Sequence, residues 1–227
     1  MSERPLDEPR TSIPLDTGPR ARPIAGSENF PDQATESNAR LTGLAAAVLL
    51  VLLAAEGATL LKIHRLLTAH VFIGMLLVPL VVVKIGSTGW RIARYYLGAP
   101  AYRRRGPPPL ALRLLGPLVV VTTVVVFASG IALLFVPLSE RSQMLFVHKA
   151  SFVLWFGAMT LHVVAHLLDT ARLAPADLVT ATRRQVRGAG ARLWALAATL
   201  VLGVVLGIVM LPAVSNWLSA GGITRGG

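Results

Sequence analysis

The residues best suited to chemistry in this sequence are its histidines, and all of them lie in or beside apolar segments. The sequence holds five: His64, His70, His148, His162 and His166. A polar side chain inside hydrocarbon is costly and usually serves a function. Imidazole is a frequent metal ligand and a usual axial ligand of haem iron. We therefore expect these histidines to hold a haem inside a membrane.

The spacing of His148 and His162 places both rings on one face of a helix. They are 14 residues apart, which is close to four helical turns and about 21 Å along the axis. That arrangement suits two stacked haems, one near each membrane surface. His166 follows one turn deeper on the same face. Three roles stay open for His166: inner ligand, hydrogen-bond donor to a ligand, or a cation favoured near a helix C-terminus.

His64 and His70 cannot both face one ring. They are six residues apart, which on a helix means about 9 Å of rise and roughly 120° of rotation. His70 lies deeper in its apolar run, so we expect His70 and His148 to be the ligand pair of an outer haem. His64 would contact a haem propionate or water. His162 is the third candidate metal ligand.

Composition makes the chain a multi-span membrane protein. Of 227 residues, 54% are hydrophobic and the mean hydropathy is +0.63, with no cysteine. The absence of cysteine excludes disulfides, iron–sulfur ligation and covalent haem attachment, so packing and axial ligands must hold any haem. Apolar runs long enough to cross a bilayer occupy residues 41–61, 64–85, 114–136, 147–168 and 193–214.

We expect an all-α integral membrane helical bundle with a four-helix haem-binding core and a fifth transmembrane helix. Residues 1–37 are polar, lack apolar periodicity and read as a disordered cytoplasmic tail. Residues 38–172 would form the four-helix domain. Residues 173–227 would form a basic cytoplasmic linker and the fifth helix. The start of the chain shows no cleavable signal pattern.

The charge distribution predicts the orientation in the membrane. The net charge is +11, and the basic residues concentrate in the loops between spans two and three and between spans four and five. Because such loops face the cytoplasm, the N-terminus should be cytoplasmic and the C-terminus external. The charge flanks apolar spans, which indicates contact with a lipid bilayer and not with nucleic acid. The arginine and alanine bias suggests a bacterial plasma membrane.

Three stretches of the sequence resemble a known family. They are Leu61 to His70, His148 to Phe152, and the pair His162-x-x-x-His166. Over about residues 41–170 the chain resembles bacterial di-haem cytochrome b membrane subunits, which serve hydrogenases, formate dehydrogenases and thiosulfate reductases. The resemblance implies b-type haem between helices and electron transfer between a quinone pool and a partner redox protein. Members of this family commonly take a further histidine from the first span, and that span has none here. One haem b is therefore expected, and a second is left open.

A different class of function remains as the alternative. Glu56 is an intramembrane carboxylate near the outer histidines, where it would relay protons or pair with Lys62. A small non-haem transporter or scaffold could use these groups for proton or metal handling. No long loop could hold a soluble active site, so an electron-transfer subunit of an oxidoreductase is expected in preference to a stand-alone enzyme.

Overall fold

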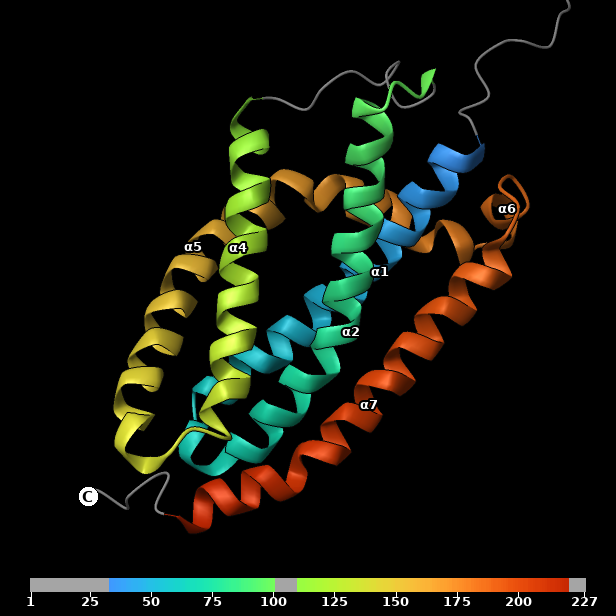
Figure 1. Cartoon of the computed structure of the whole chain (residues 1–227). Coiled ribbons are helices and arrows are strands. Elements are labelled where there is room, and N and C mark those ends of the chain that lie inside the picture. The colour runs from blue at the N-terminus through green and yellow to red at the C-terminus, as the bar shows by residue number, and fades with distance from the viewer. Residues whose placement is uncertain (1–32, 101–109, 221–227) are drawn as a thin grey trace, which may run out of the picture. The chain divides into compact units, whose positions relative to one another are not determined.

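Each predicted span forms a helix in the computed structural model, which describes residues 33–100 and 110–220 (Figure 1). Within these residues five helices are long and apolar enough to cross a membrane. The prediction of an all-α bundle with five spans is confirmed. The long helices are α1 Gln33–Leu60, α2 Ile63–Tyr96, α4 Leu110–Leu133, α5 Arg141–Leu173 and α7 Ala189–Ser219, with the short elements η1 Leu138–Glu140, η2 Ala174–Asp177 and α6 Thr180–Arg183.

Most of the helices extend beyond the predicted apolar runs. Helix α1 begins at Gln33, inside the stretch assigned to the tail, while residues 1–32 lie outside the described part of the chain. Helix α2 continues to Tyr96, and the Arg94 guanidinium lies 5.6 Å from the centre of the Trp90 ring. Helix α4 ends at Leu133, earlier than residue 136, because the chain turns there toward Pro137. The Arg103, Arg104 and Arg105 run lies outside the described residues.

Four of the helices close into a ring. Helix α1 packs between α2 and α5, and α4 packs closely on α5 and more loosely on α2. This order puts α2 and α5 at opposite corners of the ring, facing each other across its centre (Figure 1). Side chains on the inward faces of α2 and α5 can therefore meet only in the middle of the bundle.

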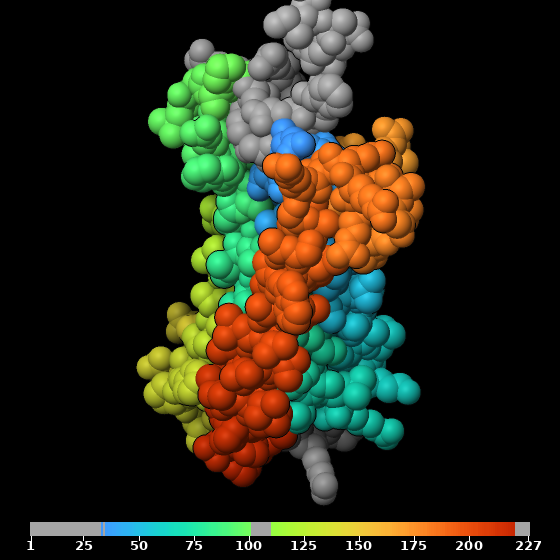
Figure 2. Space-filling model, turned by 90° about the vertical axis from the view of Figure 1, so that its right-hand side faces the viewer, coloured from blue at the N-terminus to red at the C-terminus, as the bar shows by residue number. Residues whose placement is uncertain are grey.

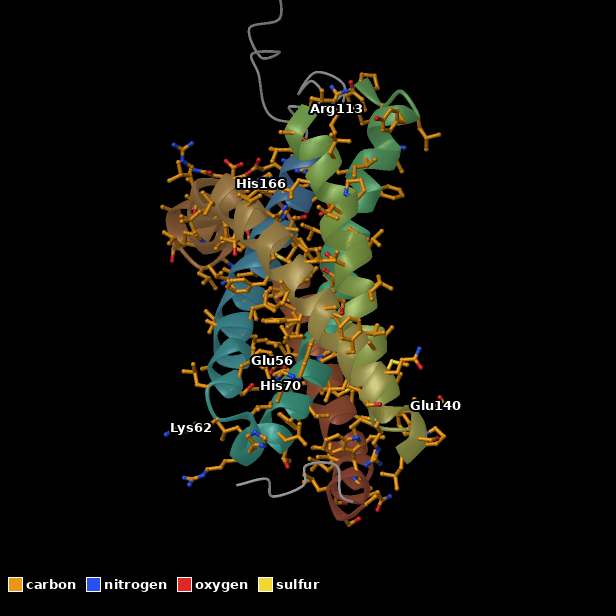
Figure 3. All side chains as sticks on the ribbon, turned by 90° about the vertical axis from the view of Figure 1, so that its left-hand side faces the viewer. Glu56, Lys62, His70, Arg113, Glu140 and His166 are labelled. Atoms are coloured by element: carbon orange, nitrogen blue, oxygen red, sulfur yellow. The ribbon has the colours of Figure 1, made fainter. Side chains whose placement is uncertain are left out.

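The bundle has two distinct ends, which Figure 3 labels by residue. The hairpin end holds the α1–α2 turn at Lys62 and the short helix η1 with Glu140. The connector end holds His166, η2 and α6. Helices α2 and α5 both run from the hairpin end to the connector end.

Apolar side chains cover much of the outward surface. Val121 is 61% exposed and Val164 is 70% exposed, although both lie in the middle of long helices. Inside, several hydroxyls donate to the carbonyl one turn back, as Thr123 does to Val119 at 2.6 Å. Polar groups satisfied within the helix and apolar groups facing outward are what a bilayer requires. The arrangement indicates contact with lipid.

Helix α7 lies along the outer face of α2, and two glycines set how closely it approaches (Figure 2). A Cβ atom at Gly203 would lie 2.7 Å from the Leu76 carbonyl oxygen. At Gly207 it would lie 2.6 Å from the Phe72 ring. The two residues form a small-xxx-small face that allows the backbones to come together, as the sequence indicated.

A buried charge network joins α1, the connector and α7. Asp177 is 1% exposed, and Arg192 donates hydrogen bonds to its carboxylate from both Nε and Nη2. Arg40 approaches the same carboxylate at 3.5 Å and donates to the Thr182 carbonyl at 2.8 Å. Arg192 also donates to Ser37 at 2.8 Å. Each guanidinium thus has several acceptors, as buried charges require.

We predict that replacing Gly203 with alanine destabilises the protein by about 1–3 kcal/mol, because the added methyl group meets the α2 backbone. Gly157→Ala is the matched control, since a Cβ at Gly157 meets no atom within 4 Å. The thermal unfolding midpoint of the detergent-solubilised protein measures both. Equal midpoints for the two variants would show that α7 does not depend on this close approach.

We also predict that Asp177→Asn costs about 3–5 kcal/mol, because it leaves two buried guanidinium groups without their carboxylate. Asp169→Asn removes an exposed acid, whose side chain is 71% exposed, and should leave the unfolding midpoint nearly unchanged. The same thermal measurement compares the two variants. Comparable decreases of the unfolding midpoint in both variants would show that the Asp177 ion pairs contribute no more to stability than an exposed acid does.

Candidate functional site

His70 is held on the inner side of α2 by two groups of α1. Its Nδ1 lies 3.0 Å from Glu56 Oε1 and 2.9 Å from Thr59 Oγ1. The side chains of His70 and Glu56 are only 20% and 17% exposed. The α1–α2 turn brings these residues together, because it folds the two helices back against each other at the hairpin end.

The hydrogen-bond network determines which nitrogen of His70 carries the proton. Thr59 has one hydroxyl proton, and it donates that proton to the Glu56 backbone carbonyl at 2.5 Å. Its oxygen can then only accept from His70. Nδ1 of His70 is therefore the N–H, and Nε2 keeps its lone pair.

His148 is held in the same way by α4. Its Nδ1 lies 3.1 Å from the Val126 carbonyl oxygen and 3.1 Å from Ser129 Oγ. A carbonyl only accepts, so Nδ1 is again the N–H and Nε2 again carries the lone pair. The ring lies against Gly130, where a Cβ would be 3.0 Å from His148 Cε1. Glycine at this position makes room for the imidazole.

The two imidazoles belong to α2 and α5, which do not lie next to each other in the ring of helices. The imidazoles lie within electrostatic range of one another, and both are half-buried. Within the described residues each ring makes its hydrogen bonds through Nδ1. Two such rings with free Nε2 lone pairs form a donor set suited to a six-coordinate haem iron. The chemistry of these two side chains suits the haem that the sequence predicted, and the haem itself stays a prediction.

The remaining histidines occupy other positions. His64 is exposed on the first turn of α2 at the hairpin end. His162 and His166 lie toward the connector end of α5, with ring centres 4.8 Å apart (Figure 3). His166 Nδ1 is 3.9 Å from Asp169. Each remains a candidate from the sequence, but only His70 and His148 are brought together across the bundle.

Glu56 does not pair with Lys62, the partner that the sequence suggested. The structure pairs its carboxylate with His70 rather than with Lys62, which is exposed on the turn. Its second oxygen, Oε2, is buried and has no hydrogen-bond partner among the described residues. Gly74 lies beside it, since a Cβ there would be 3.5 Å from Oε1. In this position Glu56 orients His70 through Oε1, and its Oε2 remains a buried atom without a hydrogen bond among the described residues.

Two further kinds of site were considered: a cluster of metal ligands and a surface groove. Among the described residues, no cluster of three or more histidine and acidic side chains could hold a bare metal ion. An axial haem pair needs only two ligands. A groove between α2 and α7 at the hairpin end is lined mainly by apolar groups, including Ala69, Phe72 and Leu211. It opens one turn from His70.

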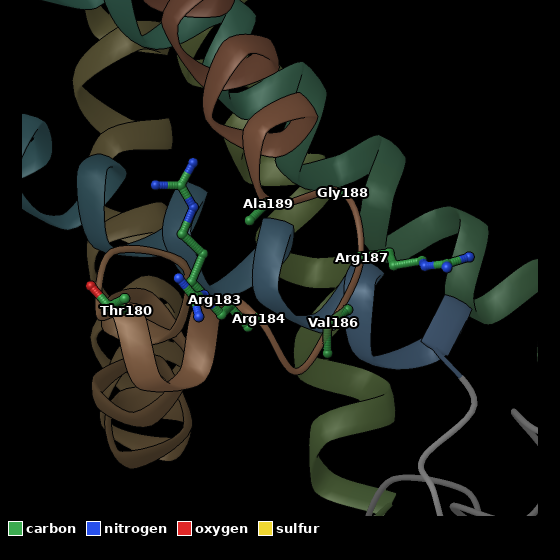
Figure 4. Close-up of a pocket in the computed structure, with 7 residues that line it drawn as sticks. All are labelled: Thr180, Arg183, Arg184, Val186, Arg187, Gly188 and Ala189. Carbon is green, nitrogen blue, oxygen red and sulfur yellow. The ribbon is translucent and has the colours of Figure 1, made fainter.

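A hollow at the connector end is basic (Figure 4). In the figure Arg187 points away from Thr180 on the opposite wall, so the guanidinium groups do not converge on one point. We assign no chemistry to it. Its lining residues are Thr180, Arg183, Arg184, Val186, Arg187, Gly188 and Ala189.

The groups that orient the two histidines were not predicted from the sequence. Thr59, Ser129 and the Val126 carbonyl are ordinary residues of apolar helices, and only the tertiary arrangement gives them a role. One signal was available for Ser129: it immediately precedes Gly130, and small residues inside a span commonly mark a close approach.

Comparisons of the chain with protein-family models, with curated proteins and with solved structures found no match.

Proposed function

We propose that this protein is a membrane-bound b-type cytochrome that transfers electrons between a quinone pool and a partner redox protein. His70 and His148 are the residues that would hold its haem b. The observation that supports this assignment is the anchoring of both imidazoles through Nδ1 on diagonally opposed helices. That arrangement leaves the Nε2 atom of each ring without a hydrogen bond among the described residues.

Haem b supplies a one-electron carrier when bound. Held by two imidazoles, this haem would pass electrons in preference to binding oxygen. Val126 and Ser129 hold His148 in one orientation, and Glu56 and Thr59 do the same for His70. Hydrogen bonds from Nδ1–H to these acceptors fix the orientation of each ring and raise the basicity of its Nε2 atom, which would hold the haem.

The location and orientation of the protein follow from the same proposal. We place the chain in a bacterial plasma membrane with the connector end, and so the N-terminus, in the cytoplasm. The connector carries a concentration of arginines, including Arg172, Arg183 and Arg184, which supports this orientation. The groove between α2 and α7 is the place we propose for a quinone, because it is largely apolar and adjoins the helix that carries His70.

One observation favours a second candidate function. Glu56 Oε2 is buried without a partner beside His70, and a carboxyl–imidazole pair inside a membrane is a common element of proton relays. In this alternative the protein is a small non-haem transporter or scaffold that handles protons or a metal. Haem content separates the two functions.

We predict that the purified protein is red and shows a reduced b-type absorption spectrum. Replacing either His70 or His148 with alanine should abolish that haem, because one axial ligand is lost. His64→Ala is the matched control on α2: its ring is exposed, so the haem content should stay close to that of the unmodified protein. Haem quantified per chain, with oxidised and dithionite-reduced spectra, gives the result.

A colourless protein from haem-sufficient cells that takes up no haem on reconstitution would favour the proton or metal function. Loss of haem in His64→Ala but not in His70→Ala would move the ligand on α2 to His64.

We predict a cytoplasmic connector end and an external C-terminus, because the basic loops alternate along the chain. A reporter fused at Thr180 should report the cytoplasm, and one fused after Ser219 should report the external side. A cytoplasmic signal from the second fusion would overturn this orientation.

A further inference from the structure

The connector between α5 and α7 is held in place by two buried arginines that bind its backbone. Arg40 of α1 donates to the Thr182 carbonyl at 2.8 Å, and Arg192 of α7 donates to the Arg187 carbonyl at 2.8 Å. Both guanidinium groups also contact the buried carboxylate of Asp177. The stretch from Thr182 to Arg187 is therefore fixed at each end.

Three other arginines of this stretch are exposed and have no acid to pair with. Arg183, Arg184 and Arg187 line one hollow at the connector end (Figure 4). Among the described residues, the ion pairs of the connector all involve Asp177, whose carboxylate is already taken by the buried arginines. Arginines are mostly exposed in proteins, so their exposure alone assigns no ligand.

The arrangement of these arginines does not suit one small anion. Arg187 points away from Thr180 on the opposite wall, and the guanidinium groups do not converge (Figure 4). A site for a single phosphate directs several donors onto the same oxygens. Arginines spread over a surface instead suit several anionic groups that lie side by side, as lipid headgroups do.

Apolar side chains beside the arginines indicate a membrane surface. Leu178 is 63% exposed and Val179 is 50% exposed, between η2 and α6. Trp194 is 78% exposed and lies little more than one turn after the start of α7. Tryptophan near the end of a span is typical of the membrane–water interface. Because the connector joins two membrane-spanning helices, it stays at the bilayer surface.

We propose that the connector binds the headgroups of anionic phospholipids through Arg183, Arg184 and Arg187, while Leu178 and Val179 enter the acyl region beside them. Basic and apolar side chains in one short segment are the usual composition of interfacial lipid-binding segments. The fixed backbone favours this binding, since little of it has to be ordered when lipid arrives. The binding goes beyond the proposed function and does not depend on haem.

An acidic surface of a partner protein is the competing occupant. It would pair with the same arginines, but it would bind without regard to the charge of the surrounding headgroups. Lipid is favoured because the two spans keep the connector beside headgroups at all times. An experiment that changes only the headgroup therefore separates the two occupants.

Trp194 can report which lipids lie next to the connector. The full-length protein is reconstituted in phosphatidylcholine bilayers with a minor fraction of phosphatidylglycerol, and one of the two lipids carries bromine on its acyl chains. Bromine quenches tryptophan fluorescence on contact, and Trp194→Phe identifies the part of the signal that Trp194 supplies. At equal mole fraction, brominated phosphatidylglycerol should quench Trp194 several-fold more than brominated phosphatidylcholine. High salt should remove this preference, because it screens exposed charges.

The preference should disappear when Arg183→Gln, Arg184→Gln and Arg187→Gln are combined. Each arginine near an anionic surface contributes about fivefold to affinity, so single replacements should reduce the preference by up to about that factor. Lys62→Gln with Arg65→Gln is the control, since it removes two exposed cations at the hairpin end. The control should keep the preference of the unmodified protein.

Equal quenching by the two lipids in the unmodified protein would overturn the proposal, as would a preference that survives the triple replacement. Loss of the preference in the hairpin-end control would also contradict it, because the effect would then follow total charge. Soluble glycerol phosphate should not displace the lipid; displacement at a concentration too low to screen charge would assign the arginines to a free phosphate. If the triple variant does not fold, the single replacements and the salt dependence of the unmodified protein decide.

Discussion

An imidazole inside a bilayer has two nitrogens to satisfy and almost no water to satisfy them. Leaving a polar group unpaired there costs several kcal/mol, on the order of a whole hydrogen bond. His70 and His148 each commit Nδ1 to acceptors on a neighbouring helix, Glu56 and Thr59 on α1 for one and Val126 on α4 for the other. That commitment determines the tautomer, the ring orientation and the direction of each Nε2 lone pair.

The arrangement of the helices follows from this constraint. Each histidine needs a neighbour that supplies acceptors, so α2 must pack on α1 and α5 must pack on α4. Helices α2 and α5 then occupy opposite corners of the ring. Gly130 allows the His148 ring to approach α4 closely. Outside the ring, α7 supports α2 through Gly203, and the Asp177 network ties α7 to the start of α1.

The five spans were predictable because hydropathy over about 20 residues is a strong local signal. The pairing of His70 with His148 stays a prediction, which rests on their similar depth in spans two and four; these spans run in parallel because they alternate along the chain. The partner of Glu56 was not predicted, because Lys62 is closer along the chain and only the packing of α1 on α2 selects His70.

The burial of Asp177 could not have been read from the sequence. A lone acid in a basic connector is usually solvated, and its 1% exposure depends on two arginines, from α1 and α7. Long-range ion pairs carry no periodic signal, so they appear only when the helices are placed. The ion pairs of Asp177 consequently hold the connector against α1 and α7, although its composition is that of an exposed loop.

The central claim is that two imidazoles from α2 and α5 bind one iron, and electron paramagnetic resonance of the oxidised protein tests it most directly. The account predicts a low-spin ferric signal with bis-imidazole ligation that disappears when either His70 or His148 is replaced by alanine. A high-spin ferric signal in the unmodified protein, or a low-spin bis-imidazole signal that survives both replacements, would contradict it.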